Sequence, residues 1–239
     1  GGCNHYYPHL WPRYTDTGDA FNIRVGDRTR HIRKAGCSRL LALDWAMGKP
    51  KKDERSKQAA ALGMLELKGD CTAFVIADLD NDNGILFLLD CTNERIPMGS
   101  NAPRLAEVCR RWEPIVVAGD DDNLSETMLL ETRRYRDIPM VKPMAIGGRN
   151  KLVRSQAAIV RAERGMMYLP QDDYRTQKSW VEMLTDQLAS FTGADGEQDD
   201  IADAVAILGR LADEFVPGED TIDQDPILGV VGYDGGGIW

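Results

Sequence analysis

The chain has 239 residues, of which 43% are hydrophobic, and its formal net charge at pH 7 is −9. This length suits one α/β domain with tails, and the hydrophobic share is enough to build a buried core. The sequence contains neither an apolar run near the roughly 18 residues that a membrane helix needs nor a signal-peptide pattern. Its five cysteines include no CxxC pair, which argues against a disulfide framework. We therefore expect a soluble, cytoplasmic protein without a membrane partner.

The first part of the chain is an irregular segment followed by strand patterns. Residues 1–35 are rich in aromatic, charged, Gly and Pro residues without clear periodicity, and we interpret them as a linker. The apolar runs that follow predict three buried strands, the first of which ends in an acid. These strands are expected over 39–44, 71–78 and 85–91. The Asn-Asp-Asn-Gly sequence at 81–84 predicts a tight hairpin turn between the second and third strands.

The second part of the chain alternates between helix and strand patterns. Helices are expected over 102–112, 124–135, 151–164, 180–191 and 200–215, and strands over 114–118 and 138–143. Pro103 in a first turn and Gly165 after a last turn are typical of helix boundaries. The Gly, Pro and Asp residues of 216–239 predict a flexible tail. The order of the elements predicts an α/β domain over 36–215, with a mixed central β-sheet flanked by helices.

Acidic residues occupy three corresponding places. Asp44 ends the first strand, the run from Asp120 to Asp122 follows the strand at 114–118, and Asp200 and Asp203 open the last helix. In open α/β sheets, ligands collect at the carboxyl ends of the strands, so the strand acids converge if their strands are adjacent and parallel. Asp200 and Asp203 are three residues apart and share a helix face. Asp200 lies at the border of the apolar face that packs on the sheet.

Carboxylates brought together repel one another and need a compensating cation. Hard divalent ions such as Mg²⁺ or Mn²⁺ suit a site made only of carboxylates. Two such ions can activate a water and stabilise the leaving oxygen of a phosphodiester. The candidate metal ligands are Asp44, Asp120, Asp121, Asp200 and Asp203. The alternative for each acid is a turn or a helix cap.

The chain contains clusters of basic residues although its net charge is negative. A nucleic-acid-binding protein is usually basic, but local patches decide where a phosphate backbone docks. The clusters comprise Arg28, Arg30, Arg33 and Lys34; Lys49, Lys51 and Lys52; Arg133, Arg134 and Arg136; and Arg149, Lys151 and Arg154. The candidates for contact with DNA phosphates are Lys49, Lys51, Lys52, Arg149, Lys151 and Arg154. A solvated loop and an ordinary charged helix surface are the alternatives.

From about Leu40 to Leu211, the sequence resembles the nuclease domains of phage large terminase subunits. Residues 41–44 (Leu-Ala-Leu-Asp) are similar to the family's first catalytic strand. Residues 69–73 (Gly-Asp-Cys-Thr-Ala) resemble its step into the second strand, and 116–123 occupy the place of the strand with the second acid. That acid is often Glu in the family, whereas Gly119 precedes three aspartates here. The second acid could therefore be Asp120, Asp121 or Asp122. We favour Asp120, which is nearest the strand end.

The later motifs continue the resemblance. Residues 151–154 (Lys-Leu-Val-Arg) are similar to the family's Lys-x-x-Arg helix, and 180–191 resemble its Glu-Leu-x-x-Phe segment. Residues 199–204 (Asp-Asp-Ile-Ala-Asp-Ala) resemble the closing Asp-Asp-x-x-Asp-Ala motif, which is the most specific of these signals. The shorter Asp-x-x-Asp-Ala piece also recurs in Holliday-junction resolvases.

The resemblance implies an RNase H-like fold and a two-metal endonuclease that cuts concatemeric viral DNA during genome packaging in the host cytoplasm. The implied catalytic acids are Asp44, Asp120, Asp200 and Asp203, with two Mg²⁺ or Mn²⁺ ions. The implied partners are double-stranded DNA, a terminase ATPase domain, the portal and the small terminase subunit. Because the sequence has no GxxxxGK[ST] phosphate loop, we expect an isolated C-terminal nuclease fragment, with residues 1–35 partly an interdomain linker.

Two alternatives to this function stay open at this point. One is a Holliday-junction-type resolvase of the same fold, which would prefer branched DNA to linear DNA. The other is a non-catalytic packaging-motor assembly module, in which the acids cap helices and the acidic tail docks on a portal or motor partner. Metal-dependent cleavage would separate the first from the second, because shared fold does not by itself establish activity.

Overall fold

The computed structural model describes residues 5–46, 71–121, 126–145, 150–171, 179–194 and 199–215 of the chain. The strands are β1 (Arg13–Asp16), β2 (Ala20–Val25), β3 (Arg28–Arg33), β4 (Cys37–Asp44), β5 (Thr72–Asp80), β6 (Leu86–Glu94), β7 (Val116–Asp120), β8 (Val141–Met144) and β9 (Met167–Pro170). The α-helices are α2 (Asn101–Trp112), α3 (Glu126–Thr132), α4 (Lys151–Glu163), α5 (Ser179–Ser190) and α6 (Asp200–Phe215). Short 3-10 turns are η1 (Pro8–Leu10), η2 (Lys34–Gly36) and η3 (Met98–Ser100). Within these ranges, no helix is both long and apolar enough to cross a membrane.

Most elements of the core lie where their sequence patterns predict them. Helix α6 has the predicted bounds, α2 and α4 differ from theirs by one residue at one end, and α5 is shifted by one residue at both ends. The predicted hairpin turn joins β5 to β6, and Gly84 takes a φ of 68° there, in the left-handed region that glycine tolerates. Helix α3 ends earlier than predicted because Arg134 and Tyr135 donate backbone hydrogen bonds three residues back, which tightens its last turn.

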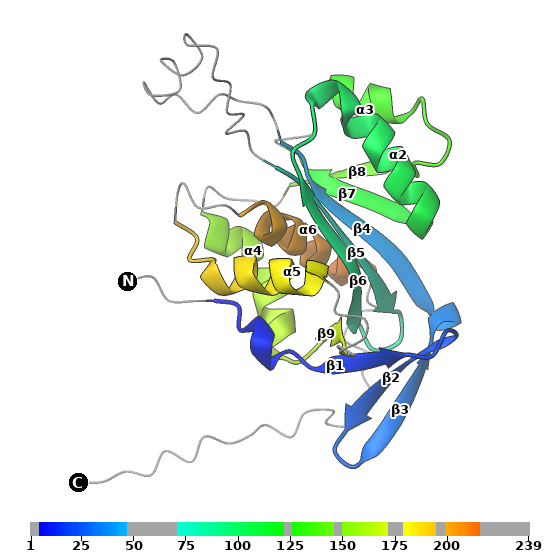
Figure 1. Ribbon diagram of the computed structural model, residues 1–239, viewed down its shortest axis with the longest axis vertical. Helices are drawn as coiled ribbons and strands as arrows, with labels where there is room; N and C mark the ends of the chain where they lie inside the picture. The colour runs from blue at the N-terminus through cyan, green and yellow to red at the C-terminus, as the bar shows by residue number, and fades with distance from the viewer. Residues whose placement is uncertain are drawn as a thin grey trace, which may run out of the picture.

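One mixed sheet organises the molecule (Figure 1). Its strand order is β3-β2-β1-β9-β6-β5-β4-β7-β8. Strand β4 pairs antiparallel with β5 and parallel with β7, which in turn pairs parallel with β8. Strand β5 also pairs antiparallel with β6, so it alone runs against the other four strands in the stretch β6-β5-β4-β7-β8. This arrangement confirms the predicted α/β class with an RNase H-like mixed sheet flanked by helices.

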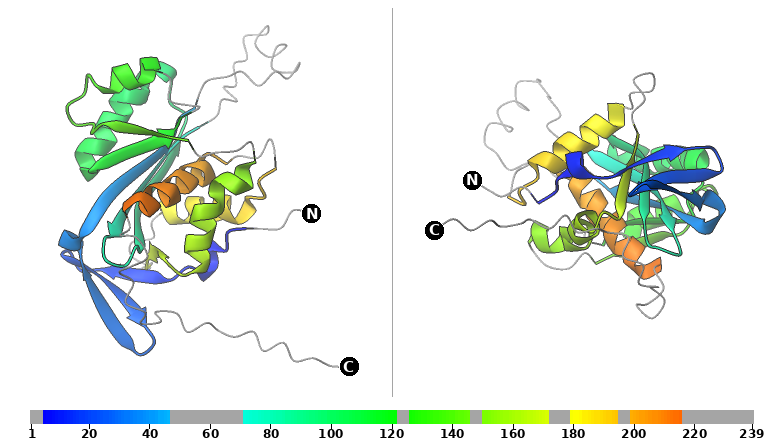
Figure 2. Two further views of the ribbon diagram at one scale, coloured as in Figure 1. Left: turned by 180° about the vertical axis from the view of Figure 1, so that it is seen from behind. Right: turned by 90° about the horizontal axis from the view of Figure 1, so that it is seen from below.

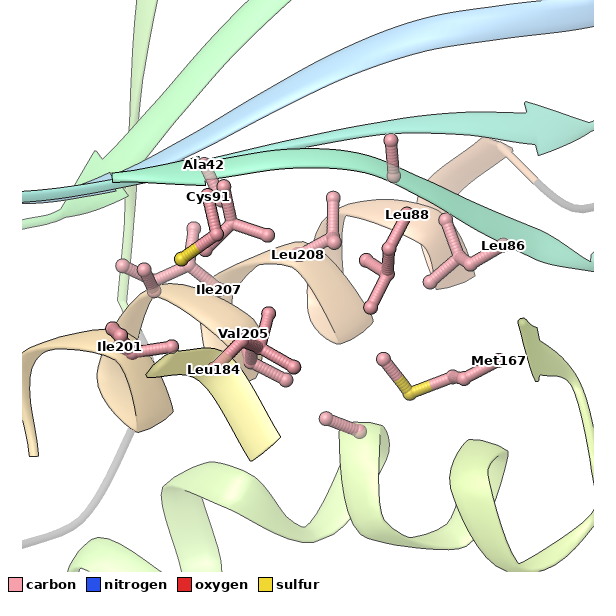
Figure 3. Close-up of a cluster of buried hydrophobic side chains, with 14 of the residues drawn as sticks. Ala42, Leu86, Leu88, Cys91, Met167, Leu184, Ile201, Val205, Ile207 and Leu208 are labelled. Carbon is pink, nitrogen blue, oxygen red and sulfur yellow. The ribbon is translucent and has the colours of Figure 1, made fainter. Parts of the chain in front are cut away.

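Helices cover both faces of this sheet and create two apolar layers. Helix α6 lies across β4 and β5 with α4 and α5 beside it, while α2 and α3 lie on the other face (Figures 1 and 2). Figure 3 shows the first layer, in which Ile207 and Leu208 of α6 lie toward Ala42 and other sheet residues, while Val205 lies beside Leu184 of α5. Alternate residues of β4 belong to different layers: Ala42 lies in the first layer, and its neighbours Leu41 and Leu43 lie in the second.

The N-terminal part of the chain belongs to this sheet, which the sequence patterns did not predict. Strands β1, β2 and β3 form an antiparallel meander, and β1 joins the rest through parallel pairing with β9. Phe21 is fully buried and stacks on Phe87 of β6, with ring centroids 4.3 Å apart. The interpretation of residues 1–35 as a linker therefore does not hold at β1–β3. There, pairing between these strands and with β9 builds regular structure. The outer boundaries of the domain stay a prediction.

Some predicted features lie outside the described residues. One is the tail over 216–239. The others are four of the candidate residues for contact with DNA phosphates, namely Lys49, Lys51, Lys52 and Arg149. The structure therefore leaves these predictions untested.

Candidate active site

Two aspartates stand side by side at the carboxyl ends of β4 and β7. The parallel register pairs Leu43 with Gly119, so Asp44 and Asp120 follow as the next residues on adjacent strands. Side chains alternate along a strand, so these two carboxylates point to the same face as Ala42, the face that α6 covers. Both aspartates are buried, with exposed fractions of 9% and 7%. This is the convergence that the sequence predicted for adjacent parallel strands.

The N-terminal turn of α6 brings two further acids to the same end of the sheet. Asp200 is buried at the start of the helix, and Asp203 lies one turn further on, with its backbone N–H donating to the carbonyl of Asp199. Helix α6 is held over β4 and β7 by its apolar residues, among them the fully buried Ile207 and Leu208. The position of the two acids thus follows from packing of the helix on the sheet.

One guanidinium links the acids of the strand and the helix. Arg154 of α4 places its Nη1 3.2 Å from Oδ2 of Asp120 and its Nη2 3.2 Å from Oδ1 of Asp203. Carboxylates from two elements that are far apart in sequence therefore lie within the span of a single side chain. The Nε atom of Arg154 is buried and lacks a hydrogen-bond partner within the described part of the protein. The site thus retains a donor for a further anionic group.

The electrostatics of this pocket are those of a crowded, partly compensated acidic site. The pKa of Asp203 is raised to about 6, chiefly by burial; the cations Arg154 and Lys151 lower it, and the charges of Asp199 and Asp120 raise it. Burial lowers the pKa of Lys151, but its hydrogen bond to Asp199 and the negative charges of Asp199 and Asp203 together outweigh burial, and the net pKa is raised. The pocket therefore holds Lys151 as a cation beside its carboxylates.

The candidate residues from the sequence fall into three groups. Asp44, Asp120, Asp200 and Asp203 gather at one end of the sheet, with Lys151 and Arg154 beside them. Asp121 is exposed, whereas Asp120 is buried, so the geometry favours Asp120 within the acidic run. Lys49, Lys51, Lys52 and Arg149 lie outside the described residues.

Sequence reasoning missed two contributors to the pocket. Asp199 begins the closing acidic motif but was not among the candidate ligands, and its carboxylate pairs with Lys151. Tyr6 was assigned to a linker, but its ring is fully buried, and its hydroxyl interacts with Ser155, the residue after Arg154. Burial raises the pKa of Tyr6, so the phenol stays neutral beneath α4. Nothing local in the sequence marks these contacts, because each depends on how distant segments pack.

The donor chemistry of the pocket fits hard divalent cations, since every candidate ligand is a carboxylate. The spacing of the carboxylates fits a bound metal ion less directly. Among the described residues, no group of three or more His, Cys, Asp or Glu side chains is arranged to hold a metal ion. Instead, the guanidinium of Arg154 bridges the carboxylates of Asp120 and Asp203.

The fold and this pocket define a class of protein: an RNase H-like α/β domain with an acidic, partly compensated site at the carboxyl end of its sheet. No known protein-family profile matches the sequence, and no curated protein matches it.

Solved structures resemble the chain at low sequence identity. The large terminase nuclease from thermophilic phage G20c with bound magnesium gives a TM-score of 0.48 at 13% identity, covering 87% of this chain and 96% of that one. The human cytomegalovirus terminase nuclease domain gives 0.47 at 13%, covering 75% and 85%. The nuclease domain of the large terminase subunit gp2 of bacterial virus Sf6 gives 0.45 at 11%, covering 72% and 87%. At these values the similarity identifies neither activity nor ligand.

Proposed function

We propose that this chain is a metal-dependent DNA endonuclease domain, in which Asp44, Asp120, Asp200 and Asp203 hold two Mg²⁺ or Mn²⁺ ions. The observation that carries the proposal is the pair of contacts from Arg154 to Asp120 and Asp203. It brings a strand-end acid and a helix acid into one buried pocket. A set of acids that served only as caps would have no reason to converge in this way.

The residues of the pocket divide the work of phosphodiester hydrolysis. When bound, two divalent ions would activate the attacking water and stabilise the leaving oxygen. The four carboxylates would bind and orient those ions. Arg154 compensates the acids when no ion is bound, and its buried Nε–H offers a donor to a phosphate oxygen. Lys151, held as a cation by Asp199, adds positive charge where the phosphate would lie.

The biological setting of the proposal comes from the sequence motifs. The closing Asp-Asp-x-x-Asp-Ala motif and the Lys-x-x-Arg helix resemble those of phage large terminases. We therefore propose that the substrate is concatemeric viral DNA cut during genome packaging in the host cytoplasm. The proposed partners are a terminase ATPase domain, the portal and the small terminase subunit.

The direct test is cleavage of supercoiled plasmid DNA with Mg²⁺ or Mn²⁺ and with a chelator. Asp44→Asn and Asp203→Asn should each lower the rate by about a hundredfold or more, on the scale of removing a group that stabilises the transition state. Asp137→Asn is the matched control, because Asp137 forms a surface pair with Arg110. Wild-type cleavage by Asp44→Asn would remove that residue from the mechanism.

A non-catalytic assembly module is the second candidate function. The observation in its favour is that Arg154 already neutralises two of the acids, Asp120 and Asp203. In that case divalent ions should neither stabilise the protein nor support cleavage. Plasmid left uncut by the wild-type chain at millimolar Mg²⁺ and Mn²⁺, with a folded protein by circular dichroism, would favour this candidate. A strong preference for a four-way junction over linear duplex would instead indicate a resolvase.

A further inference from the structure

The meander β1–β3 has two chemically different faces. Its inner face contributes Tyr14, Phe21 and Ile23 to the apolar layer around Phe87. The outward positions are those that alternate with these residues. They are Arg13 and Thr15 of β1, Ala20, Asn22 and Arg24 of β2, and Thr29, His31 and Arg33 of β3. We call this set the outer face.

The strand register fixes where charges lie on the outer face. Arg24 stands opposite Thr29, and Arg33 stands opposite Ala20 four residues along β2. At about 3.3 Å per residue, these two arginines are about 13 Å apart along the sheet. The polar side chains of Thr15, Asn22 and His31 occupy the row between them. The outer face therefore presents cations at both ends and hydrogen-bonding groups in the middle.

The outer face carries no acidic side chain on its strands, although the chain as a whole has a charge of −9. The nearby acid Asp16 is already paired with Lys34, and Asp19 and Asp27 lie in the connecting turns. Arg24 and Arg33 are exposed and form no ion pair with any residue that the structure describes. Two uncompensated arginines on an acid-free sheet face are therefore available to an external polyanion.

We propose that the outer face of β1–β3 binds the phosphate backbone of double-stranded DNA, away from the acidic pocket. Arginine, threonine and asparagine side chains are those that commonly contact backbone phosphates, and such contacts position a duplex without reading its sequence. The 13 Å spacing of the arginines is close to the about 12 Å width of the major groove. The choice of duplex DNA rests on the proposed function, whereas the charge of the face does not.

The proposed surface lies one strand length from the acidic pocket. Strand β4 starts directly after η2, which follows Arg33, and it ends at Asp44. Its eight residues span about 26 Å, which is about eight base pairs at 3.4 Å each. Figures 1 and 2 show β2 and β3 at the far end of the sheet from α3. The surface would therefore anchor DNA remote from the cut and contribute to binding, with no part in the chemistry.

The test measures binding of a fluorescent 30-base-pair duplex by anisotropy, in chelator, at several salt concentrations. Arg24→Gln with Arg33→Gln should remove two phosphate contacts and lower the slope of log K against log salt by about 1.8. At about 0.1 M salt the affinity should fall at least tenfold. The matched control is Arg110→Gln with Arg134→Gln, which changes the net charge equally at exposed arginines that already pair with acids.

Three outcomes would overturn the proposal. One is an unchanged affinity and slope in the double variant. Another is an equal loss in the control, which would show an effect of net charge alone. The third is competition by polyglutamate as strong as by duplex at equal charge, which would indicate an acidic protein as the partner. Asp44→Asn should keep wild-type duplex binding in chelator, so loss of cleavage and loss of this surface can be told apart.

Discussion

The contact between α4 and α6 holds the two halves of the acidic pocket together, and Gly209→Ala should disrupt it. Gly209 faces Ala158 so closely that an added Cβ would lie 2.8 Å from both the backbone N and the Cα of Ala158. Ordinary contact begins at 3.4 Å, so the two helices must separate by about 0.6 Å (3.4 − 2.8). Arg154 of α4 would then move away from Asp203 of α6, which it now contacts at 3.2 Å.

The magnitude follows from two opposed effects. Overpacking costs about 1–3 kcal/mol, and the obstructing atoms here are backbone, which places the cost toward the upper end. Alanine is a better helix former than glycine by about 1 kcal/mol. The net loss of unfolding free energy is therefore about 1–2 kcal/mol. For a domain of this size, that corresponds to a Tm lower by about 2–8 °C.

Thermal unfolding in chelator, followed by circular dichroism, measures this effect. Gly36→Ala is the control, because its added Cβ would meet open space. Adding Ala158→Gly to the Gly209 variant should restore little, since two of the three closest atoms belong to the backbone. Plasmid cleavage should fall as well, although every candidate ligand is intact. An unchanged or higher Tm for Gly209→Ala would refute the packing argument.

Three further predictions test the electrostatics and the extent of the core. Asp203→Asn should raise the stability of the metal-free protein at pH 7.5 by up to about 3 kcal/mol, because a carboxyl whose pKa rises from 3.8 to about 6 on folding opposes folding above pH 6. This gain should shrink as the pH falls from 6 toward 4 and vanish below that; urea titrations showing a gain independent of pH would contradict it. Phe21→Ala should cost about 3–5 kcal/mol in urea unfolding, because the ring is buried against Phe87; a linker residue would show no loss. Arg154→Gln should lower Tm in chelator and make the rise in Tm on adding Mn²⁺ larger than in the wild type, since the carboxylate of Asp120 loses its cation; an equal rise in both proteins would speak against ions at this site.

The sequence by itself determined the elements whose signals are local. Helix α6 follows from an apolar period of 3.6 residues, and β4 and β5 follow from continuous apolar runs that both sheet faces bury. The Asn-Gly turn at Gly84 follows from the backbone freedom of glycine. The acids at the strand end and helix start could also be picked out, because an open parallel sheet exposes the carboxyl ends of its strands.

Only the tertiary structure decided which distant segments pair and what the pocket contains. Strands β1–β3 escaped prediction because Asp16, Arg28 and Arg30 put charge at register positions of the inner face and break the period-2 alternation. In addition, β1 is completed by β9 some 150 residues away, at the pairing of Arg13 with Leu169. The contacts of Arg154 escaped for the same reason. Helical spacing places Lys151 and Arg154 on one face of α4, but only the packing of α4 against α6 turns that face toward the carboxylates. Local pattern determines elements, whereas the free energy of burying their faces determines which charges meet.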